Sequence, residues 1–291
     1  MPKKLPVYDL HAFGKDGLAN DLYANHLGPH VKEHAFTNLP HKHDFYLTIL
    51  VTKGSGWHEI DFKKYPVKPG RLFLMQPGQM HYWKLSGDID GFVFFHSKAF
   101  YDEGFTAAKL KYFPFFRSFQ SNPVVSLSPG RTTQLKELMA DIYETYKSND
   151  QYRLQKLHAL VSLAYIEISG NYVKRGEAKN QTYLFKVQGF ENLIEMHFRE
   201  IRSAGEYADR LNISEKHLNR ITRQCLNKTS TQLIAERMVL EAKRMLIHSG
   251  LNIAQTGYAL GYSDKSYFTR FFKKNAGETP LAFLKRYKMG A

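Results

Sequence analysis

The stretch that decides the fold is TGYALGYSDKSYFTRFFK at residues 256–273, and YADRLNISEKHLNRITR at residues 207–223 repeats its pattern earlier in the chain. Each stretch predicts a short helix, a tight turn at Gly261 or Asn212, and a second helix that starts after Asp or Ser and carries cationic and polar side chains. This is the outline of a helix-turn-helix unit, whose second helix enters the major groove of DNA. The sequence therefore predicts two such units in tandem.

A single helix is expected between the two units, over TQLIAERMVLEAKRMLIHS at residues 231–249. At 1.5 Å per residue it would extend roughly 27 Å, comparable with the roughly 34 Å between successive major-groove faces on one side of DNA. One chain could then place two recognition helices in adjacent grooves. Ser203 and Glu206 predict a capping box before the first unit, and Thr279 followed by Pro280 predicts the start of a final helix.

The charge of the chain favours a polyanionic partner for its C-terminal third. Lys and Arg number 41 against 27 Asp and Glu, which gives a formal net charge of +14. Residues 180–291 alone hold 18 basic and 10 acidic side chains. Nucleic acid and membrane surfaces both fit such a charge. No stretch approaches the roughly 18 apolar residues of a membrane span, so membrane insertion is not expected. The helix-turn-helix outline favours nucleic acid over a membrane as the partner.

Cationic and polar side chains share one face of each second helix, because they recur at spacings of three and four. Arg can bind guanine edges with two hydrogen bonds, Asn can bind adenine, and Lys and Ser suit phosphate or base contacts. The alternative for any one of them is a solvated helix face. The predicted DNA contacts are Lys216, Asn219, Arg220 and Arg223 on the first helix and Lys265, Ser266, Thr269 and Arg270 on the second.

The stretch NIAQTGYALGYSDKSYFTRFFKKNAGETPLAF at residues 252–283 resembles the DNA-binding domain of AraC/XylS transcription regulators, in which the second unit follows the pattern IA...GF.D.SYF.R.FKK..G.TP. Gly257 stands where that family usually has alanine, and Asn227 replaces a usual glycine. The resemblance implies a cytoplasmic regulator, not an enzyme, that binds double-stranded promoter DNA, with RNA polymerase as a further candidate partner. The family pattern R....A..LL of the connecting helix is matched by Arg237, Ala242, Met245 and Leu246.

Short strand-like segments fill most of the first 100 residues. They are rich in β-branched and aromatic side chains and lie at residues 45–51, 57–62, 68–85 and 89–95. The pairs Pro69-Gly70 and Pro77-Gly78 predict turns between strands. Short strands with such turns and no helical period predict an antiparallel sandwich or barrel.

Two stretches, HKHDFYLTILVTKGSG at residues 41–56 and PGRLFLMQPGQMH at residues 69–81, resemble the signature stretches of a cupin barrel. A metal-binding cupin would supply a pair of histidines, a glutamate and a distal histidine. Leu47 and Thr48 occupy the glutamate region, so we expect no metal cofactor. A cupin metalloenzyme, an oxygenase or isomerase with an accessory DNA-binding domain, is the alternative, and an architectural DNA binder without a ligand is a third option. The three histidines that such a metal site would use are His41, His43 and His81.

A small-molecule pocket in the barrel is the preferred prediction for the N-terminal part. Aromatic faces with a few polar groups suit such a pocket, although the same residues could simply form a core. A sugar would fit this chemistry, and the resemblance to carbohydrate-responsive regulators points the same way. The candidate effector-binding residues are His43, Phe45, Trp57, His81 and Trp83.

Two amphipathic helices are predicted after the strands, because apolar residues recur at spacings of three and four over residues 135–146 and 154–168. Leu160 and Leu163 widen the apolar surface of the second helix, which favours homodimerisation or a fully buried helix. The expected fold class is α+β with two domains. The expected segments are a cupin-like barrel at 1–127, a helical hairpin at 128–170, a linker at 171–182 and a tandem helix-turn-helix domain at 183–291.

The N-terminus and the cysteine content bear on the compartment. MPKKLPVYDL has no apolar core of signal-peptide length after its lysines. The single cysteine, Cys225, cannot form an internal disulfide, which suits a reducing compartment. We therefore expect the chain in the cytoplasm.

Overall fold

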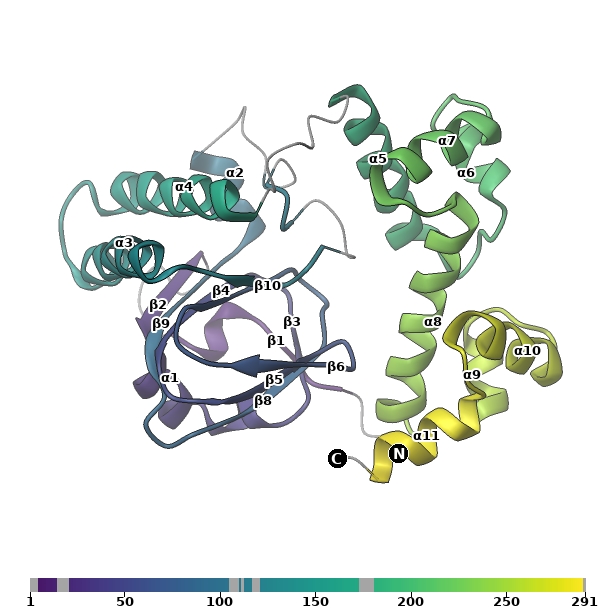
Figure 1. Cartoon of the computed structure of the whole chain (residues 1–291), viewed down its shortest axis with the longest axis horizontal. Helices are drawn as coiled ribbons and strands as arrows, with labels where there is room; N and C mark the ends of the chain where they lie inside the picture. Colours follow the sequence, from purple (N-terminus) through teal and green to yellow (C-terminus); the bar gives the residue numbers. More distant parts are fainter. Residues whose placement is uncertain are drawn as a thin grey trace. The chain divides into compact units, whose positions relative to one another are not determined.

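The computed structural model describes residues 5–14, 21–104, 110, 113–116, 121–172 and 181–289. Residues 6–177 form one compact unit, and residues 178–291 belong to a second (Figure 1). The expected linker at 171–182 falls largely on residues 173–180, which lie outside the described residues. No helix in the described part of the chain is both long enough and apolar enough to cross a membrane.

The N-terminal unit is built on two antiparallel sheets and a short parallel pair. The parallel pair consists of β1 (Val7–Tyr8) and β3 (Lys42–His43). The five-stranded sheet has the order β10 (Val124–Ser126), β7 (Arg71–Met75), β4 (Tyr46–Lys53), β9 (Asp90–His96) and β2 (Leu22–His26). The three-stranded sheet has the order β6 (Lys63–Val67), β5 (Gly56–Ile60) and β8 (His81–Leu85).

Six helical segments accompany these strands in the described part of the N-terminal unit. Short ones are η1 (Leu10–Ala12), α1 (Leu27–Glu33), η2 (Ala35–Asn38) and α2 (Lys98–Gly104). The long ones are α3 (Pro129–Lys147) and α4 (Arg153–Tyr172), as the apolar spacing predicts. Neither α1 nor the strand β2 before it is predicted from the sequence.

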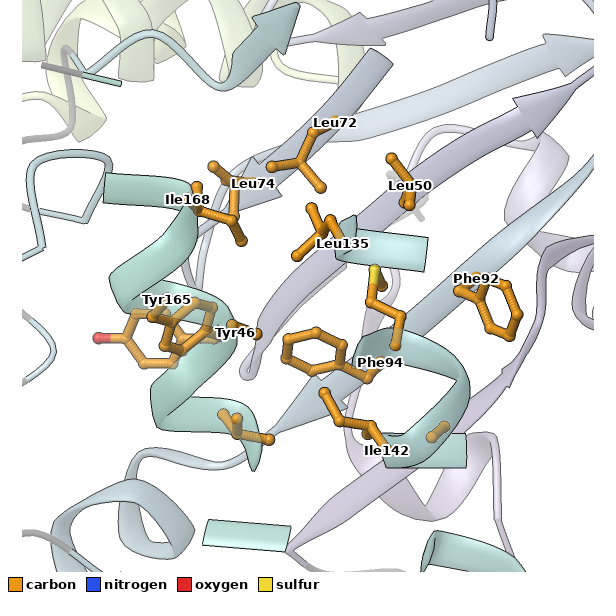
Figure 2. Close-up of a cluster of buried hydrophobic side chains, with 14 of the residues drawn as sticks. Tyr46, Leu50, Leu72, Leu74, Phe92, Phe94, Leu135, Ile142, Tyr165 and Ile168 are labelled. Carbon is orange, nitrogen blue, oxygen red and sulfur yellow. The ribbon is translucent and has the colours of Figure 1, made fainter. Parts of the chain in front are cut away.

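The five-stranded sheet separates two apolar cores, because side chains of successive strand residues point to opposite faces. On one face Tyr46 and Leu50 of β4 join the core formed with α3 and α4. Figure 2 shows this core, with Tyr165 and Ile168 of α4 beside the strands. On the other face Phe45, Leu47, Ile49 and Val51 belong to a second core that includes Trp83 of the three-stranded sheet.

The C-terminal unit is helical throughout its described residues (Figure 1). Two helix pairs are joined by the long α8, so the predicted tandem helix-turn-helix fold is confirmed. The seven helices are α5 (Gln181–His197), α6 (Ala204–Arg210), α7 (Glu215–Leu226), α8 (Ser230–His248), α9 (Ile253–Ala259), α10 (Lys265–Ala276) and α11 (Pro280–Met289).

The ends of these helices follow from local chemistry. Asn212 (φ 52°) and Gly261 (φ 79°) adopt the left-handed conformation in the predicted turns. Asn227 (φ 55°) ends α7 in the same conformation, which asparagine tolerates better than most residues and which accounts for the glycine usual in the family. Ser203 does precede α6, but its side chain makes no capping hydrogen bond, so the expected capping box is wrong. Capping boxes occur instead before α8 and α9.

Candidate functional site

The two second helices, α7 and α10, are built alike. The side chain of Ser214 accepts a hydrogen bond from the backbone of His217, and that of Asp264 accepts one from Tyr267. Each helix thus starts with a capped first turn, which aligns residues of α7 with residues of α10 from the N-terminus onward. Arg220 and Arg270 occupy equivalent positions in this alignment.

Most of the predicted DNA contacts lie in water on the outer face of their helix. The inner face of each helix is buried, with Leu218 on α7 and Phe268 and Phe272 on α10 in the core. This burial fixes which face remains available for a partner. The exposed predicted contacts are Lys216, Arg220, Arg223, Lys265, Ser266 and Arg270.

Two predicted contacts are placed differently. Asn219 is half-buried, and its Oδ1 accepts a hydrogen bond of 3.2 Å from the backbone N–H of Ser230 at the start of α8. A two-bond contact with adenine uses that same oxygen, so we assign Asn219 to the junction between α7 and α8. Thr269 is also half-buried, and its hydroxyl donates to the carbonyl oxygen of Lys265 at 2.8 Å.

An ion-pair network centred on the buried Arg237 joins α5 to α8, the helix between the two helix-turn-helix units. Arg237 donates from Nε to Glu195 at 2.7 Å and from Nη1 to Glu241 at 3.2 Å. Its guanidinium also lies 4.0 Å from the centre of the Phe198 ring. Removing one partner of such a network leaves an uncompensated buried charge. The arginine of the family pattern in this helix therefore holds the unit together.

The interior of the N-terminal unit contains a cluster of buried histidines, here called the histidine cluster. Its members are His30, His41, His43, His58 and His81. The rings of His41 and His81 are 4.2 Å apart between centroids, and His58 Nε2 lies 2.8 Å from His81 Nδ1. His41, His43 and His81 are among the residues predicted from the sequence, whereas His30 and His58 are not. Strand alternation could have identified His58, because it places His58 on the opposite face of the strand from Trp57. In the structure His58 is paired with Trp83 across the sheet.

Burial keeps these imidazoles neutral. It lowers the pKa of His30, His43 and His58 to about 3 and holds the pKa of His81 well below its ordinary value. The Nδ1 of His43 donates to the carbonyl oxygen of Phe45 at 2.9 Å, which leaves its Nε2 as an acceptor. The cluster therefore offers uncharged hydrogen-bonding groups.

Several polar atoms of this interior have no hydrogen-bond partner in the structure. They are His30 Nε2, His43 Nε2, His81 Nε2 and Trp83 Nε1. Buried polar atoms are nearly always paired, so a set of unpaired ones at a single place indicates a site for a bound group. Among the described residues, no three His, Cys, Asp or Glu side chains are arranged to hold a metal ion.

The expected effector residues divide into two groups. His43, Phe45, His81 and Trp83 are buried together in the interior. Trp57 is not with them, because it lies on the opposite face of β5 from His58. Its ring packs edge-on against Tyr82 at 5.2 Å and beneath the ammonium of Lys64 at 4.5 Å. We therefore remove Trp57 from the candidate effector site.

The apolar surface of α4 is only partly free. Leu157 is fully buried and Leu160 packs against the core, whereas Leu163 is 45% exposed and Ile166 is 57% exposed. Leu163 also lines a groove of about 220 Å³ between α3 and α4. The surface available for self-association is therefore narrower than the sequence predicts and lies around Leu163 and Ile166.

Comparison with known proteins gives matches in both units. Residues 28–161 match a family model described as an AraC-like ligand binding domain, and residues 207–286 match a helix-turn-helix domain. The uncharacterized HTH-type transcriptional regulator YfiF of Bacillus subtilis is 24% identical over 87% of this chain and 81% of its own. The arabinose operon regulatory protein of Salmonella typhimurium is 22% identical over 82% of this chain and 83% of its own. The structure of ToxT from Vibrio cholerae aligns with a TM-score of 0.42 and 12% identity over 91% of this chain and 98% of its own.

Proposed function

Because the chain belongs to the AraC family of helix-turn-helix transcriptional regulators, a family without enzymatic activity, we propose that it is a cytoplasmic, sequence-specific regulator of promoters. Its C-terminal unit binds double-stranded DNA, and its N-terminal unit binds a small-molecule effector. The proposed segments are the barrel at 1–127, the helical hairpin at 128–170, the linker at 171–182 and the DNA-binding domain at 183–291.

The observation that carries the DNA-binding proposal is the repetition of exposed cations at equivalent positions of α7 and α10. Arg220 and Arg270 are the proposed base-reading residues, and Lys216, Arg223 and Lys265 are proposed phosphate or base contacts. Two such helices on one chain suit an asymmetric site with two half-sites. The excess of basic residues in this unit supplies the attraction to phosphate.

The DNA-binding proposal is tested by selection from random double-stranded DNA. Full-length protein should enrich a sequence with two half-sites. The logarithm of its binding constant should fall linearly with the logarithm of the salt concentration, because the phosphates that it neutralises release their counterions. A constitutively binding architectural protein would retain fragments without enriching any sequence. That outcome would contradict the proposal.

The effector proposal rests on the unpaired polar atoms of the histidine cluster and Trp83. Neutral imidazoles and an indole N–H provide donors and acceptors but no charge. Sugar hydroxyls can donate and accept, and a sugar ring can pack on aromatic faces. We therefore assign the effector to the class of small uncharged polar molecules, and first of all to sugars. The name of the relative from Salmonella typhimurium contains a sugar, arabinose.

The effector proposal is tested by thermal unfolding of full-length protein against a panel of sugars and other metabolites. A ligand that binds the native state raises the unfolding temperature in proportion to its concentration and affinity. A shift with a neutral sugar would support the proposal. A shift with none of the panel, or only with transition metals, would contradict it.

Self-association through α4 completes the proposal. Leu163 and Ile166 form an exposed apolar surface on a helix whose other side is anchored in the core. A second copy of the chain would remove this surface from water. Two linked copies would also bind DNA more tightly than one.

A further inference from the structure

An aromatic ring lies beside each of the two proposed base-reading arginines. The guanidinium carbon of Arg270 is 6.0 Å from the centre of the Tyr267 ring, one turn earlier on α10. The guanidinium carbon of Arg220 is 5.9 Å from the centre of the Tyr183 ring. Both distances fall within the range of cation–π attraction. Each arginine therefore has a tyrosine ring as its neighbour, but the two rings come from different parts of the fold.

In the first unit the ring comes from a different helix. Tyr183 belongs to the first turn of α5, whereas Arg220 belongs to α7. The position of Tyr267 is taken on α7 by His217, whose ring contacts Tyr183 edge-on at 5.9 Å. Arg220 also donates from Nη2 to His217 Nδ1 at 3.3 Å. Tyr183, His217 and Arg220 thus form one set of contacts across two helices.

These contacts restrict a side chain that is otherwise free to rotate. An arginine loses rotamer freedom when it binds a base, and any restriction present before binding reduces that loss. Arg220 is exposed, while Tyr183 is half-buried and so better fixed than the arginine it contacts. The ring can therefore orient the guanidinium without blocking its outer edge.

We propose that Tyr183 is a positioning residue for base recognition by Arg220. This inference rests on the proposed DNA-binding function. It gives α5 a part in the base preference of the first helix-turn-helix unit. The second unit needs no such help, because Tyr267 lies on the recognition helix itself.

The test uses full-length protein and the DNA fragment that the wild type selects from a random pool. Affinities are measured for that fragment and for versions changed at each base pair. Arg220→Ala first identifies the base pairs that Arg220 reads. Tyr183→Ala should bind the selected fragment about twofold to fivefold more weakly, as expected for one exposed cation–π contact. It should lose discrimination at the same base pairs as Arg220→Ala and at no others.

Three further variants and one control separate positioning from a general structural role. Tyr183→Phe keeps the ring and should bind like the wild type, whereas Tyr183→Leu keeps apolar bulk without the ring and should behave like Tyr183→Ala. Tyr183→Ala combined with Arg220→Ala should bind no more weakly than Arg220→Ala alone, because the two residues act as one. Tyr267→Ala is the matched control, and it should lose discrimination at the base pairs read by Arg270 and not at those read by Arg220.

The inference is overturned if Tyr183→Ala and Tyr183→Leu bind the selected fragment as tightly as the wild type does, or if they lose discrimination equally at every base pair. It is overturned as well if Tyr183→Ala lowers the DNA affinity of the Arg220→Ala protein further. It is also overturned if Arg220→Ala has no effect while the wild type still selects a sequence. A wild-type protein that selects no sequence would instead contradict the proposed function. Thermal unfolding of each variant checks that its fold is retained.

Discussion

At the scale of single residues, Trp83 brings an indole N–H into the interior of the N-terminal unit. That nitrogen has no hydrogen-bond partner in the structure, and the ring that carries it lies close to the rings of His30, His58 and His81. Leaving such a donor unpaired costs about 1–3 kcal/mol. An effector oxygen placed against this nitrogen would recover much of that free energy.

Replacing Trp83 tests this role, and Trp57 provides the matched control on the same sheet. Trp83→Phe removes the N–H and should weaken effector binding about twofold to tenfold, the value of one hydrogen bond. Trp57→Phe should leave binding unchanged, because Trp57 lies on the outer face. The measurement is the ligand-induced shift in unfolding temperature. Equal loss in both variants would place the effector elsewhere.

Replacing the proposed base-reading arginines should weaken DNA binding and change sequence preference together. Arg270→Ala should cost about 1–3 kcal/mol and relax discrimination in one half-site only, because it removes a contact to base edges. Lys285→Ala removes an exposed cation of α11, outside the recognition helices, and should change little. Fluorescence anisotropy at fixed salt checks both. A similar small loss in the two variants would show that Arg270 contributes charge alone.

The sequence predicts which types of residue form these sites better than it predicts which way their side chains point. Trp57 and Trp83 are equally plausible pocket residues until the register pairs His58 with Trp83 and turns Trp57 outward. Asn219 has the right spacing for a base contact, but the start of α8 takes up its side-chain oxygen. Both outcomes depend on neighbours that are distant in sequence or on pairing that spacing does not determine.

At the scale of secondary structure elements, α4 combines a buried side with an exposed apolar one. Its spacing predicts the helix correctly, but a wide apolar surface does not reveal which part faces the core. That choice depends on how the helix docks on the sheet. Docking buries Leu157 and Tyr165 and leaves Leu163 and Ile166 in water. The segments rich in β-branched and aromatic residues predict strands, whereas β2 and α1 have short, mixed sequences that predict neither a strand nor a helix.

A charge on this exposed surface should separate the proposed dimer. Leu163→Lys should leave the fold intact and yield monomers, because a buried ammonium at a self-association surface is costly. DNA affinity should fall about tenfold or more as the linked second copy is lost. Leu39→Lys changes another exposed leucine of the same unit and serves as control. Sedimentation velocity of the full chain measures both, and a monomeric wild type at high concentration would refute the dimer.

At the scale of the whole molecule, the histidine cluster makes stability depend on pH. Its imidazoles stay neutral in the folded chain, with the pKa of His30, His43 and His58 lowered to about 3 by burial. In the unfolded chain they bind protons below about pH 6.5. The unfolded state therefore takes up more protons as the pH falls, and the free energy of unfolding must decrease.

The resulting prediction concerns the N-terminal unit. Between pH 7.5 and pH 5 its free energy of unfolding should drop by about 2 kcal/mol for each histidine that stays neutral when folded. Denaturant unfolding followed by tryptophan fluorescence reports this unit, since both tryptophans lie in it. His58→Asn should reduce the dependence on pH. Stability that is constant over this range would mean that the histidines are protonated in the folded state.

The ion-pair network around the buried Arg237 has a consequence for the geometry of the DNA site. It ties α8 to α5, and α8 extends about 28 Å between the helix pairs. A rigid connector of fixed length makes the chain sensitive to helical phase as well as to base sequence. Inserting about five base pairs between the half-sites would turn one of them to the opposite side of the duplex. Binding should then fall to the level of a single half-site, and an insertion of about ten base pairs should not restore it, because α8 cannot lengthen to follow the groove.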